Sequence, residues 1–142
     1  MRTFTTLLFA GVTVLPLCLA TEGLADPAVC QVTITSPSGG QMVGPFTPVT
    51  GTVSARAAAA GDGIVFVVIH PDKDFYWVAP MANVSKLEWN SPAQFGIPET
   101  PHGFHFEVRA FVAPAVALRE GDRLSGFPEA ACASNTVHVL HN

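Results

Sequence analysis

The five histidines are the residues of this sequence most able to bind a metal ion. His102 and His105 lie three residues apart, as do His138 and His141. This spacing places two side chains on one face of a helix but on opposite faces of a strand, so neither pair is a ready chelate in a strand. A site could still assemble across strands, for example from His105, His138 and Glu107, because directly opposed residues have Cβ atoms about 5 Å apart. The alternative is that the histidines are ordinary exposed residues of strands.

Two adjacent aromatic residues offer a different kind of binding surface. Tyr76 and Trp77 are neighbours in a segment expected to be a strand, so their side chains point to opposite faces. One of them therefore faces outward, where a ring provides a flat apolar surface with a polar edge for a sugar or a protein side chain. Trp89 alternates with Leu87, and both are expected in the core. We therefore predict Tyr76 and Trp77 as ligand-binding residues.

An outward strand face of mixed charge adds His105, Glu107 and Arg109 to the predicted ligand-binding residues. As an acid–base site this face lacks a nucleophile and a second carboxylate at a defined spacing. The sequence also contains no Gly-x-Ser-x-Gly elbow. Asp62, Asp72 and Asp74 could recruit Ca²⁺, but acidic residues in loops more often serve as turn residues. We assign no catalytic residue, no metal ligand and no cofactor, and expect a protein that is not an enzyme.

The elements that must position these side chains are strands. Period-two alternation of apolar and polar residues dominates the chain and predicts seven of them. They are residues 30–35, 48–53, 64–69, 75–78, 86–90, 103–112 and 136–141. Residues 64–69 form a continuous apolar run rich in β-branched side chains, which predicts a central strand covered on both faces. Residues 70–74 are predicted to form a turn.

The segment 55–60 is rich in alanine, the best helix former. It is short, no amphipathic period extends it, and Gly61, Asp62 and Gly63 close it as a turn. We therefore interpret it as a strand end followed by a loop. Short strands, 12 glycines, 12 prolines and no amphipathic helix together predict an all-β sandwich with a single core.

Residues 1–25 have the pattern of a signal peptide, with one early positive charge, an apolar stretch and small residues before the cut. Cleavage is predicted after Ala25, with Ala20 as the second choice. A membrane anchor is the alternative, but the apolar run is shorter than the roughly 20 residues that span a bilayer, and Pro16 interrupts it. The mature domain is then residues 26–142, secreted or periplasmic, with no membrane span.

Removal of the signal leaves an even number of cysteines. Cys18 lies within the predicted signal, so Cys30 and Cys132 remain. In an oxidising compartment this parity predicts one disulfide. The bridge would close a loop of about 100 residues, which the chain-entropy model credits with at most about 4–5 kcal/mol. A metal or redox site made from two cysteines would need closer spacing or further ligands.

An ordered series of short motifs runs through nearly all of the mature chain. It comprises residues 34–37 with Gly39 and Gly40, residues 49–53, residues 64–71 with Tyr76 and Trp77, Trp89, Gly96, residues 103–108 and residues 124–128. This series resembles the immunoglobulin-like accessory domains of secreted bacterial proteins. The resemblance implies an immunoglobulin-like β-sandwich whose terminal strands are neighbours, so that a bridge between Cys30 and Cys132 pins the ends of the domain together. It also implies a spacer or binding module, and it supplies no catalytic residues.

The expected function is that of a non-catalytic secreted or periplasmic β-sandwich that recognises a protein or glycan surface. Its partner would be an extracellular or envelope protein or glycan. The net charge of −4 argues against a nucleic-acid partner, which would require a clustered basic face. The alternative from another class is a periplasmic metal-binding protein that uses the strand histidines, and a hydrolase comes third.

Overall fold

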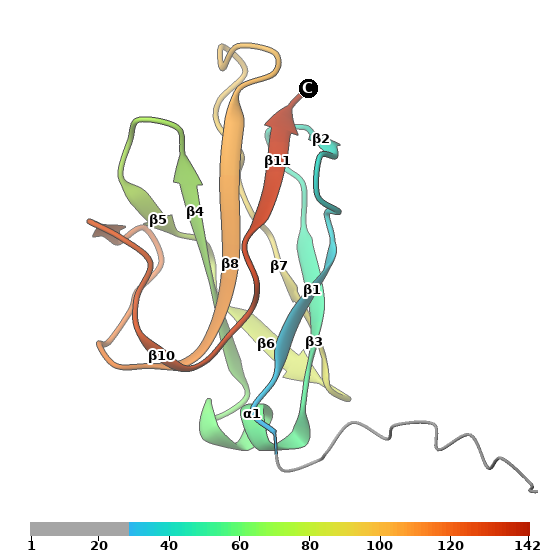
Figure 1. Cartoon of the computed structure of the whole chain (residues 1–142), viewed down its shortest axis with the longest axis vertical. Helices are drawn as coiled ribbons and strands as arrows, with labels where there is room; N and C mark the ends of the chain where they lie inside the picture. Colours follow the sequence, from blue (N-terminus) through green and yellow to red (C-terminus); the bar gives the residue numbers. More distant parts are fainter. Residues whose placement is uncertain (1–28) are drawn as a thin grey trace, which may run out of the picture.

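The computed structural model describes residues 29–142, so the predicted signal peptide and Cys18 lie outside the described residues. This part of the chain forms eleven strands and one short helix (Figure 1). In chain order they are β1 (Val32–Ser36), β2 (Met42–Val43), β3 (Val49–Val53), α1 (Ala55–Ala60), β4 (Ile64–Pro71), β5 (Tyr76–Val78), β6 (Ala82–Ser85), β7 (Glu88–Ser91), β8 (His105–Pro114), β9 (Arg123–Leu124), β10 (Ala130–Ala133) and β11 (Val137–His141). No helix among these residues has the length and apolar character needed to cross a bilayer.

Strands β4 and β8 lie side by side and join the two halves of the sheet (Figure 1). The hydrogen-bonded path runs β1-β3-β7-β6-β4-β8-β11-β2 and curls into a half-barrel. Strand β5 pairs with the last part of β4, and β9 pairs with β5. Strand β10 pairs with the end of β8, whereas β11 pairs with its beginning. The beginning of β8 is therefore held between β4 and β11.

The nearly all-β architecture and the single disulfide predicted from the sequence are both confirmed. Each of the seven predicted strands is present, in some cases with shifted ends. Eleven strands occur rather than about seven because β2, β6, β9 and β10 are only two to four residues long. Such short segments carry too little alternation to be recognised in a sequence.

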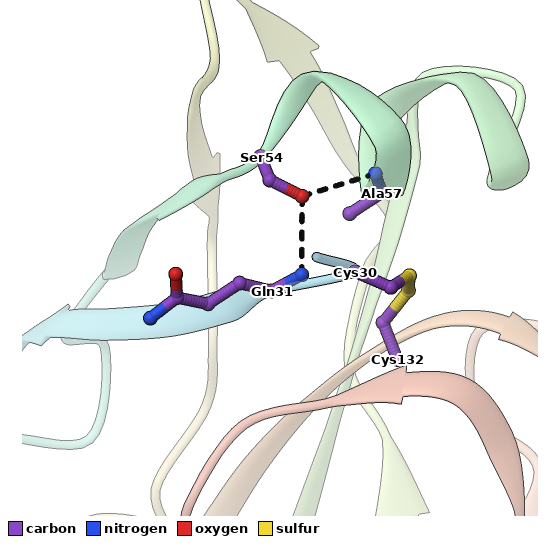
Figure 2. Close-up of a disulfide and its surroundings, with 5 residues drawn as sticks. All are labelled: Cys30, Gln31, Ser54, Ala57 and Cys132. Atoms are coloured by element: carbon purple, nitrogen blue, oxygen red, sulfur yellow. Dashed lines mark hydrogen bonds between the residues drawn. A yellow bond between two sulfur atoms is a disulfide. The ribbon is translucent and has the colours of Figure 1, made fainter. Parts of the chain in front are cut away.

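The disulfide joins Cys30, just before β1, to Cys132 in β10 (Figure 2). The two Cα atoms are 5.5 Å apart, although 102 residues separate them in the sequence. Cys132 is buried in the main hydrophobic core, and Cys30 packs against that core. The bridge therefore ties the start of the described chain to the strand that lies beside the end of β8.

The expected loop at residues 55–60 is wrong, because these residues form the helix α1. Ser54 caps it: the side-chain hydroxyl oxygen accepts hydrogen bonds from the backbone N–H of Ala57 at 3.2 Å and of Gln31 at 3.1 Å (Figure 2). At the other end the Gly61 N–H donates to the Ala57 carbonyl at 3.0 Å. Ala57 is fully buried. The cap and this tertiary contact stabilise a helix that is too short to persist alone.

Both faces of β4 are covered, as the apolar run predicts. Val65 and Val67 belong to the main core, which also contains Trp89. Val68 points to the other face and belongs to a smaller cluster with Phe111. Because apolar contacts fix β4 on both sides, the side chains at its end are held at defined positions.

Leu87 does not lie in the core, contrary to expectation. Its side chain is 43% exposed, whereas Trp89 is buried at 3%. Lys86 and Leu87 form the two-residue turn between Ser85 and Glu88, which face each other in β6 and β7. Both turn residues have positive φ angles, 51° for Lys86 and 64° for Leu87. A turn of this kind takes Leu87 out of the strand and away from the face that Trp89 occupies.

Candidate functional site

Three polar side chains form a row across the neighbouring strands β4, β8 and β11. In the register of the strands, His70 of β4 lies opposite Glu107 of β8, and Glu107 lies opposite His138 of β11. Directly opposed residues share one face of a sheet, so the carboxylate stands between two imidazoles. The pairing of β8 with β4 on one edge and with β11 on the other creates this row.

The Glu107 carboxylate contacts both imidazoles through their Nδ1 atoms. His70 Nδ1 lies 3.2 Å from Oε2, within hydrogen-bond distance. His138 Nδ1 lies 3.7 Å from Oε1, which is an ion-pair distance but too long for a hydrogen bond. The His70 side chain is 22% exposed, that of Glu107 37% and that of His138 64%. His70 is therefore the most firmly held of the three.

A second row lies two residues further along the same face. The Asp72 N–H donates a hydrogen bond of 3.1 Å to the carbonyl of His105, so the β4–β8 ladder continues beyond the end of β4. Asp72 and His105 are two residues from His70 and Glu107, and so share their face. A cavity of about 350 Å³ lies between the rows and is lined by His70, Asp72, His105, Glu107 and His138. We call it the histidine cavity.

An aromatic cluster supports one side of this face. The His70 ring stacks on Tyr76, which in turn meets Phe127 edge-on with ring centroids 4.7 Å apart. The Arg109 guanidinium lies 5.2 Å from the centroid of Phe127 and donates from Nε to the Ser134 carbonyl at 3.2 Å. These contacts hold Tyr76 and Arg109 at fixed positions beside the cavity.

The structure thus places four of the five predicted ligand-binding residues, Tyr76, His105, Glu107 and Arg109, on one face, while Trp77 lies on the other. Trp77 is paired with Ile69 in the β4–β5 ladder, and the Arg123 guanidinium lies 4.5 Å from the centroid of its ring. The five predicted residues therefore lie on two surfaces, which are opposite faces of the same strands.

Trp77 lines a larger groove of about 780 Å³, which we call the Trp77 groove. Its walls come from the end of β4, from β5, from the residues before and at the start of β8, and from the segment 92–101. The lining residues are Phe46, Ile69, Pro71, Asp74, Trp77, Val78, Ala79, Pro80, Pro92, Gln94, Gly96, Ile97, Thr100, Pro101, Phe104, Phe106, Glu120 and Gly121. Phe46 and Ile97 are 76% and 54% exposed. Most of this lining is aromatic, aliphatic or proline.

Sequence reasoning missed His70, because the pair His70–Pro71 was predicted to open a turn. Both residues belong to β4 instead. A signal was available: Phe66, Val68 and His70 continue one period-two series, so His70 shares a face with its predecessors. His102 is exposed outside the cavity, and His141 is buried at 3% in the core. The pair His138 and His141 is split between the two faces of β11, as expected for a strand, whereas His102 lies in a turn before β8 rather than in a strand.

The histidine cavity provides imidazole nitrogens and carboxylate oxygens, which are ligands of divalent transition metals and also proton acceptors. As the side chains stand, no three His, Cys, Asp or Glu residues within 29–142 converge to hold one ion. The Trp77 groove provides apolar contact area with a few polar groups, which suits a binding site for an organic ligand or a protein segment.

Comparison of the chain with family models, with curated proteins and with solved structures found no match.

Proposed function

We propose that this chain is an exported, non-catalytic recognition domain of the immunoglobulin-like type that binds an extracellular or envelope partner in the Trp77 groove. The observation that carries the proposal is the groove itself, with Trp77 in its wall and Phe46 exposed at 76%. Its volume of about 780 Å³ falls within the range of about 300–1,000 Å³ typical of ligand sites.

The lining favours a protein partner over a glycan. Sugar recognition combines a stacking ring with many hydrogen bonds, whereas this lining has few polar side chains, Asp74, Gln94, Thr100 and Glu120. Exposed apolar side chains gathered on one surface are typical of protein–protein contact sites. Apolar side chains of the partner would fill the space between Phe46 and Trp77.

Export is supported by the bridge between Cys30 and Cys132, because disulfides persist mainly in oxidising compartments.

The immunoglobulin-like assignment is supported by a buried tryptophan in the same core as the bridge. Trp89 and Cys132 both belong to the main cluster. The curled path of the strands accommodates this assignment because the sheet folds around that core.

Site-specific photocrosslinking in the native envelope or medium tests the proposed function. A photoreactive residue at Phe46 is expected to capture a protein partner, and one at Val116, which is 57% exposed and does not line the groove, is expected to capture none. Binding of the captured partner to purified chain should weaken at least tenfold in Trp77→Ala and remain unchanged in Val116→Ala. Equal capture at both positions, no capture at all, or binding of glycans alone on an array would refute the protein-recognition proposal.

A further inference from the structure

We propose that the partner of the Trp77 groove is a protein segment with an apolar centre and a basic residue, lysine or arginine, on each side of that centre. This inference rests on the function proposed above and specifies the chemistry of the partner. The apolar centre would fill the groove beside Trp77. The two basic side chains would pair with Asp74 and Glu120, which lie in the groove wall.

The charge of the lining carries the first step of the argument. Asp74 and Glu120 are the charged residues of the lining, and both are exposed. Within residues 29–142 neither carboxylate forms an ion pair. The basic residues next to them in the sequence, Lys73 and Arg119, do not line the groove. The groove therefore presents negative charge to an incoming molecule, which favours a partner of complementary positive charge.

The placement of the two carboxylates carries the second step, because they lie beyond opposite ends of β5, the strand of Trp77. Asp74 precedes β5 by two residues. The Gly121 N–H donates a hydrogen bond of 2.8 Å to the carbonyl of Val78, the last residue of β5, so Glu120 lies near that end. Four positions from Asp74 to Val78 correspond to at most about 13 Å of extended chain. Basic residues about four positions apart in an extended partner segment match this spacing.

The contact between Arg123 and Trp77 decides where a cation of the partner can bind. The Arg123 guanidinium lies 4.5 Å from the centroid of the Trp77 ring and 5.8 Å from that of Phe75. One face of the indole is thus already covered by a cation, so a second cation is expected at the carboxylates rather than on this ring. The rest of the indole, with the exposed side chains of Phe46 and Ile97, remains for apolar groups of the partner.

The same charges disfavour two other occupants of an apolar groove. A symmetric dimer through this surface would bring two copies of Asp74 and Glu120 together, in a chain whose net charge is already −4. An anionic lipid surface would be repelled by the same carboxylates. Strand β5 is hydrogen-bonded to β4 on one edge and to β9 on the other, so the partner must bind through side chains rather than by adding a strand to β5.

Panning of short random peptides displayed on phage against the purified, disulfide-bonded chain tests this partner chemistry. We expect peptides that are enriched on the wild type and lost on Trp77→Ala, with apolar residues between two basic ones. Peptides that depend on Trp77 but carry no basic residues would overturn this inference and leave the groove proposal standing. A library without any peptide that depends on Trp77 would refute both. Thermal unfolding establishes that each variant is folded.

A synthetic copy of an enriched peptide then measures the contribution of charge by fluorescence anisotropy. Asp74→Asn combined with Glu120→Gln should lower the affinity about 2–25-fold, because each exposed ion pair is worth about 1.4–5-fold. The double variant should also lose most of the salt dependence that the wild type shows. Glu129→Gln is the matched control, because Glu129 is exposed and does not line the groove, and it should bind as the wild type does. Equal affinities of the double variant and the wild type would overturn the inference.

Two further measurements check the other occupants. Sedimentation velocity of the chain alone should show no association that Trp77→Ala abolishes. Vesicles of phosphatidylglycerol should show no binding that depends on Trp77. A dimer or a vesicle complex that requires Trp77 would overturn the inference of a basic protein segment.

Discussion

The imidazole of His70 lies flat against the phenol ring of Tyr76, with ring centroids 3.9 Å apart and ring planes 4° apart. The contact arises because β5 pairs antiparallel with β4. Ile69 lies opposite Trp77, so the next residues along the ladder, His70 and Tyr76, lie beside each other. One face of the imidazole is thus covered by an aromatic ring, and its Nδ1 is engaged by Glu107. The stack connects the apolar cluster around Tyr76 to the polar row of His70, Glu107 and His138.

This stack should be measurable as a coupling free energy. A double-mutant cycle of His70→Ala and Tyr76→Ala in urea unfolding is expected to give a coupling of about 0.5–1.5 kcal/mol, the range found for aromatic pairs. Lys86→Ala replaces His70→Ala in the control cycle, since Lys86 lies in the β6–β7 turn, and its coupling to Tyr76 should be near zero. Equal couplings in the two cycles would show that the stack contributes nothing specific.

Gly51→Ala should destabilise the protein strongly. Gly51 pairs with Trp89 across β3 and β7, and a methyl group at position 51 would overlap both the indole of Trp89 and the carbonyl oxygen of Thr33. Overpacking of this kind costs about 1–3 kcal/mol or more. Gly39→Ala is the control, because a Cβ there meets no atom within 4 Å. Urea unfolding should show a clear loss for Gly51→Ala and a change within about 0.5 kcal/mol for Gly39→Ala.

His141→Leu is expected to stabilise the protein. His141 is buried at 3%, and within residues 29–142 neither ring nitrogen has a hydrogen-bond partner. A buried polar group without a partner costs about 1–3 kcal/mol, so an apolar side chain of similar size should recover a large part of that free energy. The exposed residue His102 provides the comparison, since His102→Leu should leave the urea midpoint unchanged. A lower midpoint for His141→Leu would contradict this account.

The turn between β6 and β7 offers a second stabilising change. Lys86 and Leu87 both have positive φ angles, a conformation that costs ordinary side chains about 1–2 kcal/mol per residue. Replacing them by Asn and Gly, the residues favoured in such two-residue hairpins, should raise the free energy of unfolding. Leu87→Ala removes the exposed side chain but keeps the backbone conformation, so it should give no comparable gain. Chemical unfolding of the three proteins decides between these outcomes.

Removal of the disulfide should be costly. Cys30→Ala combined with Cys132→Ala is expected to lower the free energy of unfolding by about 2–5 kcal/mol, the range for native bridges in small secreted domains. Dithiothreitol should reproduce this loss in the wild type and have no effect on the double variant. A wild-type protein with two reactive thiols after oxidation would contradict the bridge itself.

Period-two patterns predicted the strands well because a half-buried strand must alternate. Val137, His138 and Val139 alternate as expected, with both valines buried and the histidine exposed. The helix α1 escaped prediction because its stability comes from the Ser54 cap and from the burial of Ala57, and the second of these is a tertiary contact. Leu87 was misplaced because a turn, rather than the strand pattern, sets its direction.

The sequence predicted the candidate site only in part, because a local pattern of residues does not determine the register between strands. Glu107 and His138 were named together as a cross-strand possibility, and they are indeed direct partners. His105, named with them, instead lies opposite Leu140. His70 joins the row only because β4 runs two residues further than its apolar stretch, which the pairing with β8 supports. The pairing of strands depends on the arrangement of the whole sheet rather than on the sequence near each residue.

Strand β8 depends on strands from both earlier and later parts of the chain to cover its two edges. It is ten residues long, and one of its edges is occupied by β4, which precedes it in the sequence. Its other edge is occupied by β10 and β11, which follow it. A chain truncated before β10 would present a long, largely apolar strand with unpaired backbone groups, a surface that invites pairing between molecules. The last strands therefore protect against aggregation, and truncation there should yield insoluble protein rather than a smaller soluble domain.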